Sequence, residues 1–150
     1  MNKNKILINL SESDKTKFGK EDFATQSVPQ KVFSCIWALE SEVNNGGFSQ
    51  YFQNGDGAET ASFVVSALDA IGASHTSGIC KRALTCAFPA GLPANPDAIS
   101  EAATDFTGET LAGLEALDAE FMSYPDNLTE LLFAYVAKHP EEFGELQQAA

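Results

Sequence analysis

The chain has 150 residues, a net charge of −12 and a pI near 4.4. Its length suits one domain with its own core, and an apolar content of 44% excludes an intrinsically disordered chain. The charge argues against direct binding to nucleic acid or to an anionic membrane surface, so a basic protein surface is the expected electrostatic partner.

The structure of residues 1–26 is the hardest part of the chain to predict from sequence. The first 35 residues hold six lysines and four acids, whereas residues 36–150 hold 17 acids against three basic residues. The segment Lys5–Leu10 fits a short strand, an arm laid on the body, or a partly disordered stretch. We therefore divide the chain into an N-terminal arm or extension over 1–26, whose conformation is uncertain, and an all-helical domain over 27–150.

A helix predicted from residue 27 to about 43 leads into a polar corner. Ser27 is a good N-cap, and Pro29 is tolerated in the first helical turn. Because Asn and Gly tolerate positive φ, the following Asn-Asn-Gly-Gly turn can end this helix in a left-handed cap. At least one of Gly46 and Gly47 should therefore have φ > 0. The residues of this corner motif are Glu42, Asn44, Asn45, Gly46, Gly47, Phe48, Gln50, Tyr51, Phe52 and Asn54.

The corner motif admits three interpretations. In the first, its amides and Glu42 satisfy backbone groups that are exposed where two helices end. In the second, the paired glycines present free backbone amides to an anion, although no Lys or Arg lies between Lys31 and Lys81. In the third, Glu42 acts catalytically with the amides, although no His, Cys or second acid lies at a spacing that indicates a catalytic site. We predict that Asn45, Gln50 and Asn54 mainly stabilise the fold.

Short helices are predicted for the rest of the chain. The predicted elements are a loop at 55–57, helices at 58–71, 77–88 and 99–106, apolar stripes at 111–121 and 128–136, and a final turn carrying Phe143 and Leu146. Gly72 is the expected stop of the first of these helices, and Asn95 and Pro96 are expected to begin the third. Six or more helices with short connections indicate an all-α, compact single-domain bundle of about six to nine helices.

The cysteines and the apolar runs limit the compartment and the chemistry. Cys35, Cys80 and Cys86 are an odd number without a paired framework, and the spacing of the last two suits neither a redox pair nor a zinc knuckle. No apolar run approaches the ~20 residues of a transmembrane helix. The sequence contains no HExxH motif, no GxSxG motif and no phosphate-binding loop. We therefore expect a cytoplasmic, non-enzymatic protein without a metal or another cofactor.

Carboxylates recur three or four residues apart with almost no Lys or Arg between them. These acids are Glu101, Asp105, Glu109, Glu115, Asp118, Asp126, Glu130, Glu141, Glu142 and Glu145. On a helix such pairs share a face, and each pair destabilises the helix by about 0.2–0.5 kcal/mol. They form either a solvated face that favours solubility or rows of charge comparable to the phosphates of DNA, which would bind a basic surface.

The corner motif resembles the signature of the bacterial DNA-mimic protein family, which is otherwise catalogued as a domain of unknown function. A C-terminal run is also similar to that family: Leu117-Asp118, Tyr124-Pro125-Asp126, Tyr135, His139 and Glu142-Phe143. The resemblance covers roughly residues 28–146. It implies an all-helical protein that forms a homodimer. In the characterised member, the acidic surface occupies the DNA-binding face of a transcription factor.

Together these observations favour an acidic protein that binds a basic protein partner. As a DNA mimic it would block the DNA-binding surface of a transcription factor and so act in transcription regulation, without binding nucleic acid or membrane itself. An alternative is an immunity-type inhibitor that covers the basic active site of a toxin. A further alternative is a small-molecule enzyme that uses the corner from Glu42 to Asn54.

Overall fold

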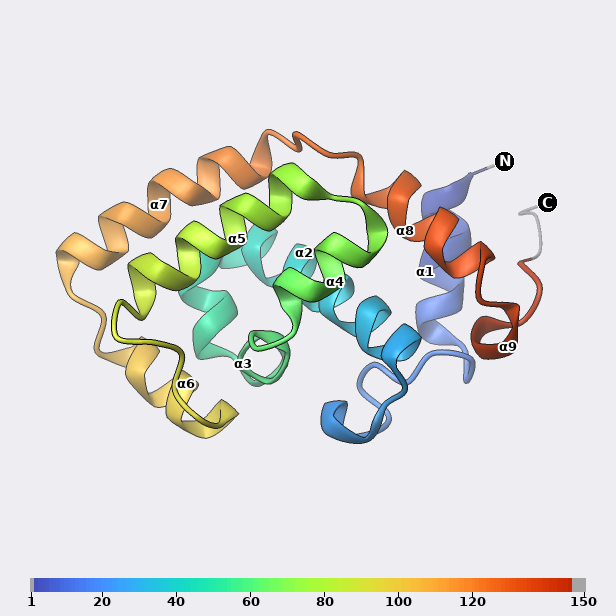
Figure 1. Cartoon of the computed structure of the whole chain (residues 1–150), viewed down its shortest axis with the longest axis horizontal. Coiled ribbons are helices and arrows are strands. Elements are labelled where there is room, and N and C mark those ends of the chain that lie inside the picture. The colour runs from blue at the N-terminus through green and yellow to red at the C-terminus, as the bar shows by residue number, and fades with distance from the viewer. Residues whose placement is uncertain (1, 147–150) are drawn as a thin grey trace.

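The computed structural model describes residues 2–146, and this part of the chain contains nine α-helices, one short 3₁₀ helix and no strand. The helices form one bundle, elongated along the horizontal axis of Figure 1. The predicted all-α bundle of six to nine helices is therefore confirmed. In chain order the elements are α1 (Lys3–Glu12), η1 (Phe23–Thr25), α2 (Val28–Gln53), α3 (Gly55–Thr60), α4 (Val64–Ile71), α5 (Ser74–Ala87), α6 (Pro96–Thr104), α7 (Gly108–Met122), α8 (Leu128–Ala137) and α9 (Pro140–Phe143).

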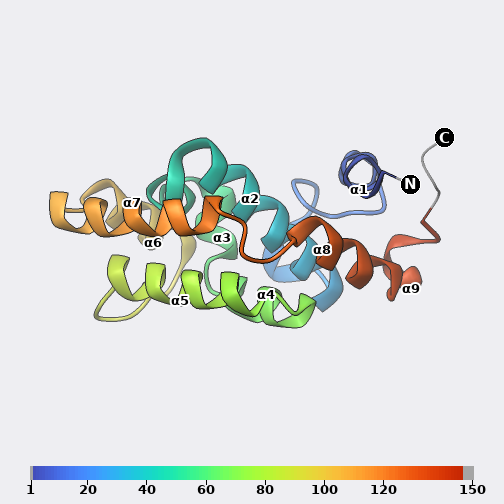
Figure 2. The same cartoon turned by 90° about the horizontal axis from the view of Figure 1, so that it is seen from above.

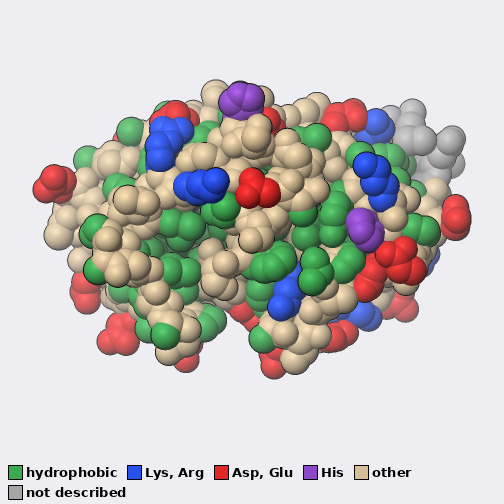
Figure 3. Space-filling view, viewed as in Figure 1, with side chains coloured by type: hydrophobic (Ala, Val, Ile, Leu, Met, Phe, Trp, Pro, Cys, Tyr) green, Lys and Arg blue, Asp and Glu red, His purple; other side chains and the backbone are tan. Residues whose placement is uncertain are grey.

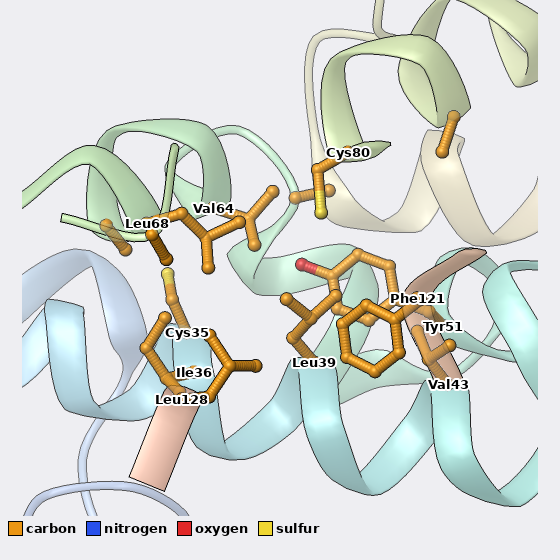
Figure 4. Close-up of a cluster of buried hydrophobic side chains, with 14 of the residues drawn as sticks. Cys35, Ile36, Leu39, Val43, Tyr51, Val64, Leu68, Cys80, Phe121 and Leu128 are labelled. Atoms are coloured by element: carbon orange, nitrogen blue, oxygen red, sulfur yellow. The ribbon is translucent and has the colours of Figure 1, made fainter. Parts of the chain in front are cut away.

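Helix α2 is the central element of the bundle. It has 26 residues and packs against α3, α4, α6, α7 and α8. Its buried side chains include Val32, Phe33, Ile36, Leu39 and Val43, which recur at helical spacing. Figure 4 shows how side chains of α4, α5, α7 and α8 meet those of α2 in this core. Full burial of one such side chain contributes about 1.5–3 kcal/mol, so the core rather than helix propensity holds α2 in place.

Two further layers cover α2. Helices α4 and α5 run along one side, and α7 packs along both α2 and α5, which closes the edge of the bundle seen from above in Figure 2. Side-chain caps begin several helices: Ser27 accepts from the backbone N–H of Gln30, and Asn95 accepts from that of Ala98. Gly72 ends α4 with φ 83°. These caps and this stop agree with the sequence prediction.

The prediction of a loop at 55–57 is wrong, because Gly55 begins helix α3 directly after α2. The reason is the close packing of α3 on the end of α2: a Cβ at Gly57 would lie 1.7 Å from the carbonyl oxygen of Tyr51. The helix predicted from 58 to 71 is in fact divided between α3 and α4, with a turn at 61–63. Glycines that indicate a loop in the sequence here allow two helices to approach each other.

The N-terminal segment, whose conformation the sequence left open, forms helix α1. The side chain of Asn2 accepts from the backbone N–H of Lys5 and caps this helix. Ile6, Leu7 and Leu10 are buried, and α1 packs against α8 at one end of the molecule (Figure 1). Lys3 at the start of α1 forms an ion pair with Glu130 of α8.

Candidate functional site

Two glycines divide α2 at the corner motif. Gly46 has φ −153° and ψ 16°, and Gly47 has φ 77° and ψ −176°. The helical path is interrupted there and resumes at Phe48 in a short second segment that ends at Gln53. The prediction that one of the two glycines has a positive φ is confirmed at Gly47.

Asp118 of α7 caps the second segment of α2. The backbone N–H of Phe48 donates to Asp118 Oδ1 over 2.8 Å. A Cβ on Gly47 would lie 2.2 Å from Asp118 Oδ2, so the carboxylate fills the space that a side chain would need. Burial raises the pKa of Asp118, the hydrogen bond from Phe48 opposes this rise, and the nearby Glu115 adds to it. Asp118 is thus held by the fold, although the sequence grouped it with the partner-binding acids.

The amides of the corner bind one another and Glu42. Gln50 Nε2 and Asn54 Nδ2 each donate to Glu42 Oε2 over 2.8 Å. Asn45 Nδ2 donates to Gln50 Oε1 over 3.2 Å. These contacts join the end of the first segment of α2 to the start and end of the second. The carboxylate and the amides therefore have partners within the motif.

A second polar contact joins the corner to the end of α7. Asn44 Nδ2 donates to the hydroxyl of Tyr124 over 2.7 Å, and that hydroxyl donates to Glu40 Oε1 over 3.2 Å. Tyr124 has φ 50°, in the left-handed region that few residues other than glycine adopt. Burial raises the pKa of Glu40, although the hydrogen bond from Tyr124 opposes this rise. No local signal in the sequence indicates this contact, because 80 residues separate Asn44 from Tyr124.

The aromatic residues of the corner motif belong to the core. Phe48, Tyr51 and Phe52 are each 1% exposed, and Phe48 packs edge-on against Phe121 of α7. The hydroxyl of Tyr51 shares a hydrogen bond of 2.8 Å with Thr60 Oγ1. The aromatic half of the motif thus fixes the second segment of α2 between α3 and α7.

Apart from Asp118, the predicted acids fall into two groups along the chain. Glu101, Asp105, Glu109 and Glu115 are exposed on α6, α7 and the turn between them, and no hydrogen bond or ion pair joins their carboxylates to another described residue. We call these four residues the α6–α7 acidic surface. Because α6 ends at Thr104, the first three do not form one row on one helix.

The remaining predicted acids lie toward the other end of the bundle. Asp126 precedes α8, Glu130 is on α8, and Glu141, Glu142 and Glu145 lie on or after α9. In Figure 1, α6 and α9 lie at opposite ends of the long axis, so the ten acids do not form one continuous surface. Figure 3 shows the face that carries α4 and α5, where hydrophobic side chains gather centrally and carboxylates lie mostly toward the rim.

Comparison with known proteins identifies the family of this chain. A family model described as DMP19-like protein matches residues 24–139, which is more than half of the 150-residue chain. The chain belongs to the DMP19-like protein family. This is a family of DNA mimics, so the resemblance based on the corner motif is confirmed. No curated protein and no solved structure matches the chain.

The DMP19-like region contains α2 to α8 and excludes α1 and α9. The corner motif and the α6–α7 acidic surface both lie within it, whereas Glu141, Glu142 and Glu145 lie outside it. Two other predicted acids inside the region have partners in the chain, unlike the four residues of the α6–α7 acidic surface. Glu130 pairs with Lys3, and Asp126 Oδ2 accepts from the backbone N–H and the hydroxyl of Thr76 over 2.7 and 2.9 Å.

The described part of this DMP19-like protein brings together no group of three metal-ligating side chains from His, Cys, Asp and Glu. His75 Nδ1 lies 3.2 Å from Asp126 Oδ1, and His139 Nδ1 lies 2.8 Å from the carbonyl oxygen of Tyr135. A pocket of about 280 Å³ lies between the N-terminal loop, α2 and α3, away from the corner amides. Within residues 2–146, no helix has both the length and the apolar character that crossing a membrane requires.

Proposed function

We propose that this DMP19-like protein binds a basic surface of a DNA-binding protein through its α6–α7 acidic surface and thereby acts as a DNA mimic. The observation that carries the proposal is the absence of partners for the four carboxylates among the described residues. Each of them is exposed, and the structure assigns their carboxylates no role in holding the fold. Their charge is therefore directed to solvent and to whatever binds there.

The sign and the exposure of these carboxylates suit such a role. Glu109 and Glu115 are six residues apart on α7, which corresponds to about 9 Å along the helix axis. A DNA strand carries one charge per ~3.4 Å of axis, so these carboxylates present a field of the same sign but with a lower density of charge. Such a field raises the rate at which a basic partner approaches.

The contacts also narrow the set of acids that we assign to this role. Asp118 and Asp126 cap helices, and Glu130 pairs with Lys3, so their charges are engaged within the chain. Glu141 and Glu145 are exposed, but they lie at the opposite end of the bundle. The proposal further includes a cytoplasmic, non-enzymatic protein, as the cysteines and the residue motifs indicate. It also includes a homodimer and a role in transcription regulation, as the family resemblance implies.

A pull-down from the native lysate at low and high salt identifies the partner. Binding is then measured for the quadruple variant Glu101→Gln, Asp105→Asn, Glu109→Gln, Glu115→Gln. We expect its affinity to fall about tenfold or more at low salt, while its melting temperature stays equal or rises, because repulsion is relieved. A matched control neutralises Glu12, Asp14, Glu141 and Glu145, which are exposed at the opposite end of the molecule, and should retain binding.

Competition with DNA decides between mimicry and other acidic binding. A labelled duplex bound to the partner should be displaced by this protein. A complex that contains the partner, DNA and this protein at once would contradict the proposal, as would binding that salt does not weaken. A partner with toxin activity and without DNA-binding activity would instead support the immunity-type alternative.

A further inference from the structure

Two basic residues lie beside α7 in the most acidic part of the chain. Residues 36–150 contain only three basic residues, Lys81, Arg82 and Lys138. Lys81 and Arg82 are adjacent and exposed on α5, which packs along α7 and has no Asp or Glu of its own. Lys138 is exposed at the end of α8. Two of the three positive charges therefore lie next to the helix that carries part of the α6–α7 acidic surface.

Arg82 neutralises one carboxylate of α7. Its Nη1 and Nη2 atoms donate to the two carboxylate oxygens of Glu120 over 2.9 and 2.8 Å. This bidentate hydrogen bonding lowers the pKa of Glu120 and raises that of Arg82. The two side chains are 47% and 56% exposed, and ion pairs that are so open to water add little to stability. The fold therefore does not depend on this pair.

Without Arg82, Glu120 would extend the α6–α7 acidic surface. At 100° and 1.5 Å per residue, Glu109 and Glu120 differ by about 20° around the axis of α7 and lie roughly 16 Å apart along it. Glu109 thus lies on the same side of α7 as Glu120, next to α5. No ion pair joins Glu109 to another described residue, whereas Glu120 is paired. Uncompensated charge on this side is therefore confined to the first turn of α7.

We propose that Arg82 is a specificity-determining residue that limits the partner-binding surface on its α5 side. This inference rests on the proposed function and adds to it the edge of the area that the basic partner covers. Arg82 cancels the charge of Glu120, and the adjacent Lys81 adds a positive charge that forms no ion pair with a described carboxylate. A basic partner that extended over α5 would be repelled, so the partner is directed to α6 and to Glu109 and Glu115 of α7.

Binding to the DNA-binding protein recovered in the pull-down tests this inference. Arg82→Gln removes the positive charge and frees Glu120, so affinity at low salt should rise about threefold. Lys138→Gln is the matched control, because it makes the same change in net charge at the end of α8, near α9. It should change affinity less than about 1.5-fold, since the distant charge is screened. Arg82→Lys keeps the charge and should bind as the parent chain does.

Substitution of Glu120 should have the opposite effect. Glu120→Gln leaves Arg82 without its partner, so affinity should fall about threefold. The double variant Arg82→Gln, Glu120→Gln should bind within about 1.5-fold of the parent, because the two changes in charge cancel. All these variants should melt within a few degrees of the parent, because the pair is exposed. A purely structural role of the pair would instead lower the melting temperature and would not give effects of opposite sign.

A charged paramagnetic probe locates the same edge without the natural partner. The probe is a cationic nitroxide, compared with a neutral nitroxide of similar size, and the readout is the relaxation of backbone amides in the full chain. The ratio of the two effects should be high along α6 and the first turn of α7 and low near Arg82. In Arg82→Gln at low salt, this ratio should rise about 1.5-fold at the amides around Glu120, whereas in Lys138→Gln it should not change there.

The outcomes separate this inference from the proposed function. Unchanged or lower affinity of Arg82→Gln overturns the inference, as does an equal gain in Lys138→Gln or a probe ratio that does not rise around Glu120. The proposed function is tested separately by the quadruple carboxylate variant. It stands if that variant loses binding although Arg82→Gln has no effect, and it fails if the four carboxylates have no effect.

Discussion

Gly47 combines two features that each exclude other residues. Its φ of 77° and ψ of −176° lie in a region that is essentially restricted to glycine. Its missing side chain also leaves the space that the Asp118 carboxylate occupies. The interruption of helix α2 and a contact with α7 therefore depend on the same position.

Gly47→Ala should lower the free energy of unfolding by about 2–6 kcal/mol. Backbone strain accounts for ~1–3 kcal/mol, and displacement of the Asp118 carboxylate from the Phe48 N–H accounts for a similar amount. Urea unfolding measures the change. Gly55→Ala is the control, because nothing lies within 4 Å of a Cβ there, and it should stay within about 0.5 kcal/mol of the parent. A Gly47→Ala protein of unchanged stability would contradict this account of the corner.

Asn54→Ala should lower the melting temperature without a separate effect on partner binding. The substitution removes one of the two amide donors of Glu42 Oε2, at a cost of about 1 kcal/mol, since the site is partly open to water. Gln53→Ala is the matched control, because Gln53 is exposed and its side chain has no hydrogen bond to another described residue. A stable Asn54→Ala protein that no longer binds its partner would move the functional site to the corner.

The corner shows which properties of single residues can be predicted from the sequence. The need for positive φ follows from the residue types of the turn alone. The partner of the turn does not, because Asp118 lies 70 residues away from Phe48 and its spacing to Glu115 is that of any exposed acidic pair. A carboxylate used as a distant helix cap has no local signature.

At the scale of elements, α5 begins with a cap supplied from another part of the chain. Its N-cap residue, Ala73, offers no side-chain acceptor, and Asp126 before α8 takes that role through Thr76 and His75. This explains why α5 starts at Ser74 and not at the predicted residue 77. Likewise, buried Gln30 holds the loop after α1 by accepting from the backbone N–H of Lys17 and donating to the carbonyl of Lys15. The apolar stripes of helices can be predicted from sequence, whereas such hydrogen bonds between distant elements cannot.

The cap of α5 should give a defined dependence of stability on pH. Burial opposes ionisation of Asp126, but the hydrogen bonds from Thr76 and His75 outweigh it, so its pKa lies below the ordinary value. The stabilisation is therefore complete above the unfolded pKa of about 3.9 and is lost as pH falls through the lower folded pKa. The difference in stability between the parent chain and Asp126→Asn should be largest near pH 6 and should shrink below about pH 4. A difference that does not change with pH would show that ionisation of Asp126 contributes nothing.

At the scale of the whole molecule, charge is unevenly compensated. Residues 36–150 contain 17 acids and only three basic residues, and two of these acids pair with lysine or arginine among the described residues, Glu120 and Glu130. The remaining carboxylates repel one another across the surface. The same repulsion that disfavours the compact state keeps charge available for a basic partner.

Salt should therefore change stability and binding in opposite directions. Screening reduces repulsion between the exposed carboxylates, so the melting temperature of the free chain should rise by a few degrees between about 0.02 M and about 0.5 M salt, while partner affinity falls over the same range. Calorimetry and a binding titration in the same buffers measure the two effects. The quadruple variant Glu101→Gln, Asp105→Asn, Glu109→Gln, Glu115→Gln should melt higher than the parent at low salt, and the two should converge at high salt. If the parent chain instead lost stability as salt rose, the interactions among its surface charges would be net attractive. The carboxylates of the α6–α7 acidic surface would then not destabilise the folded chain.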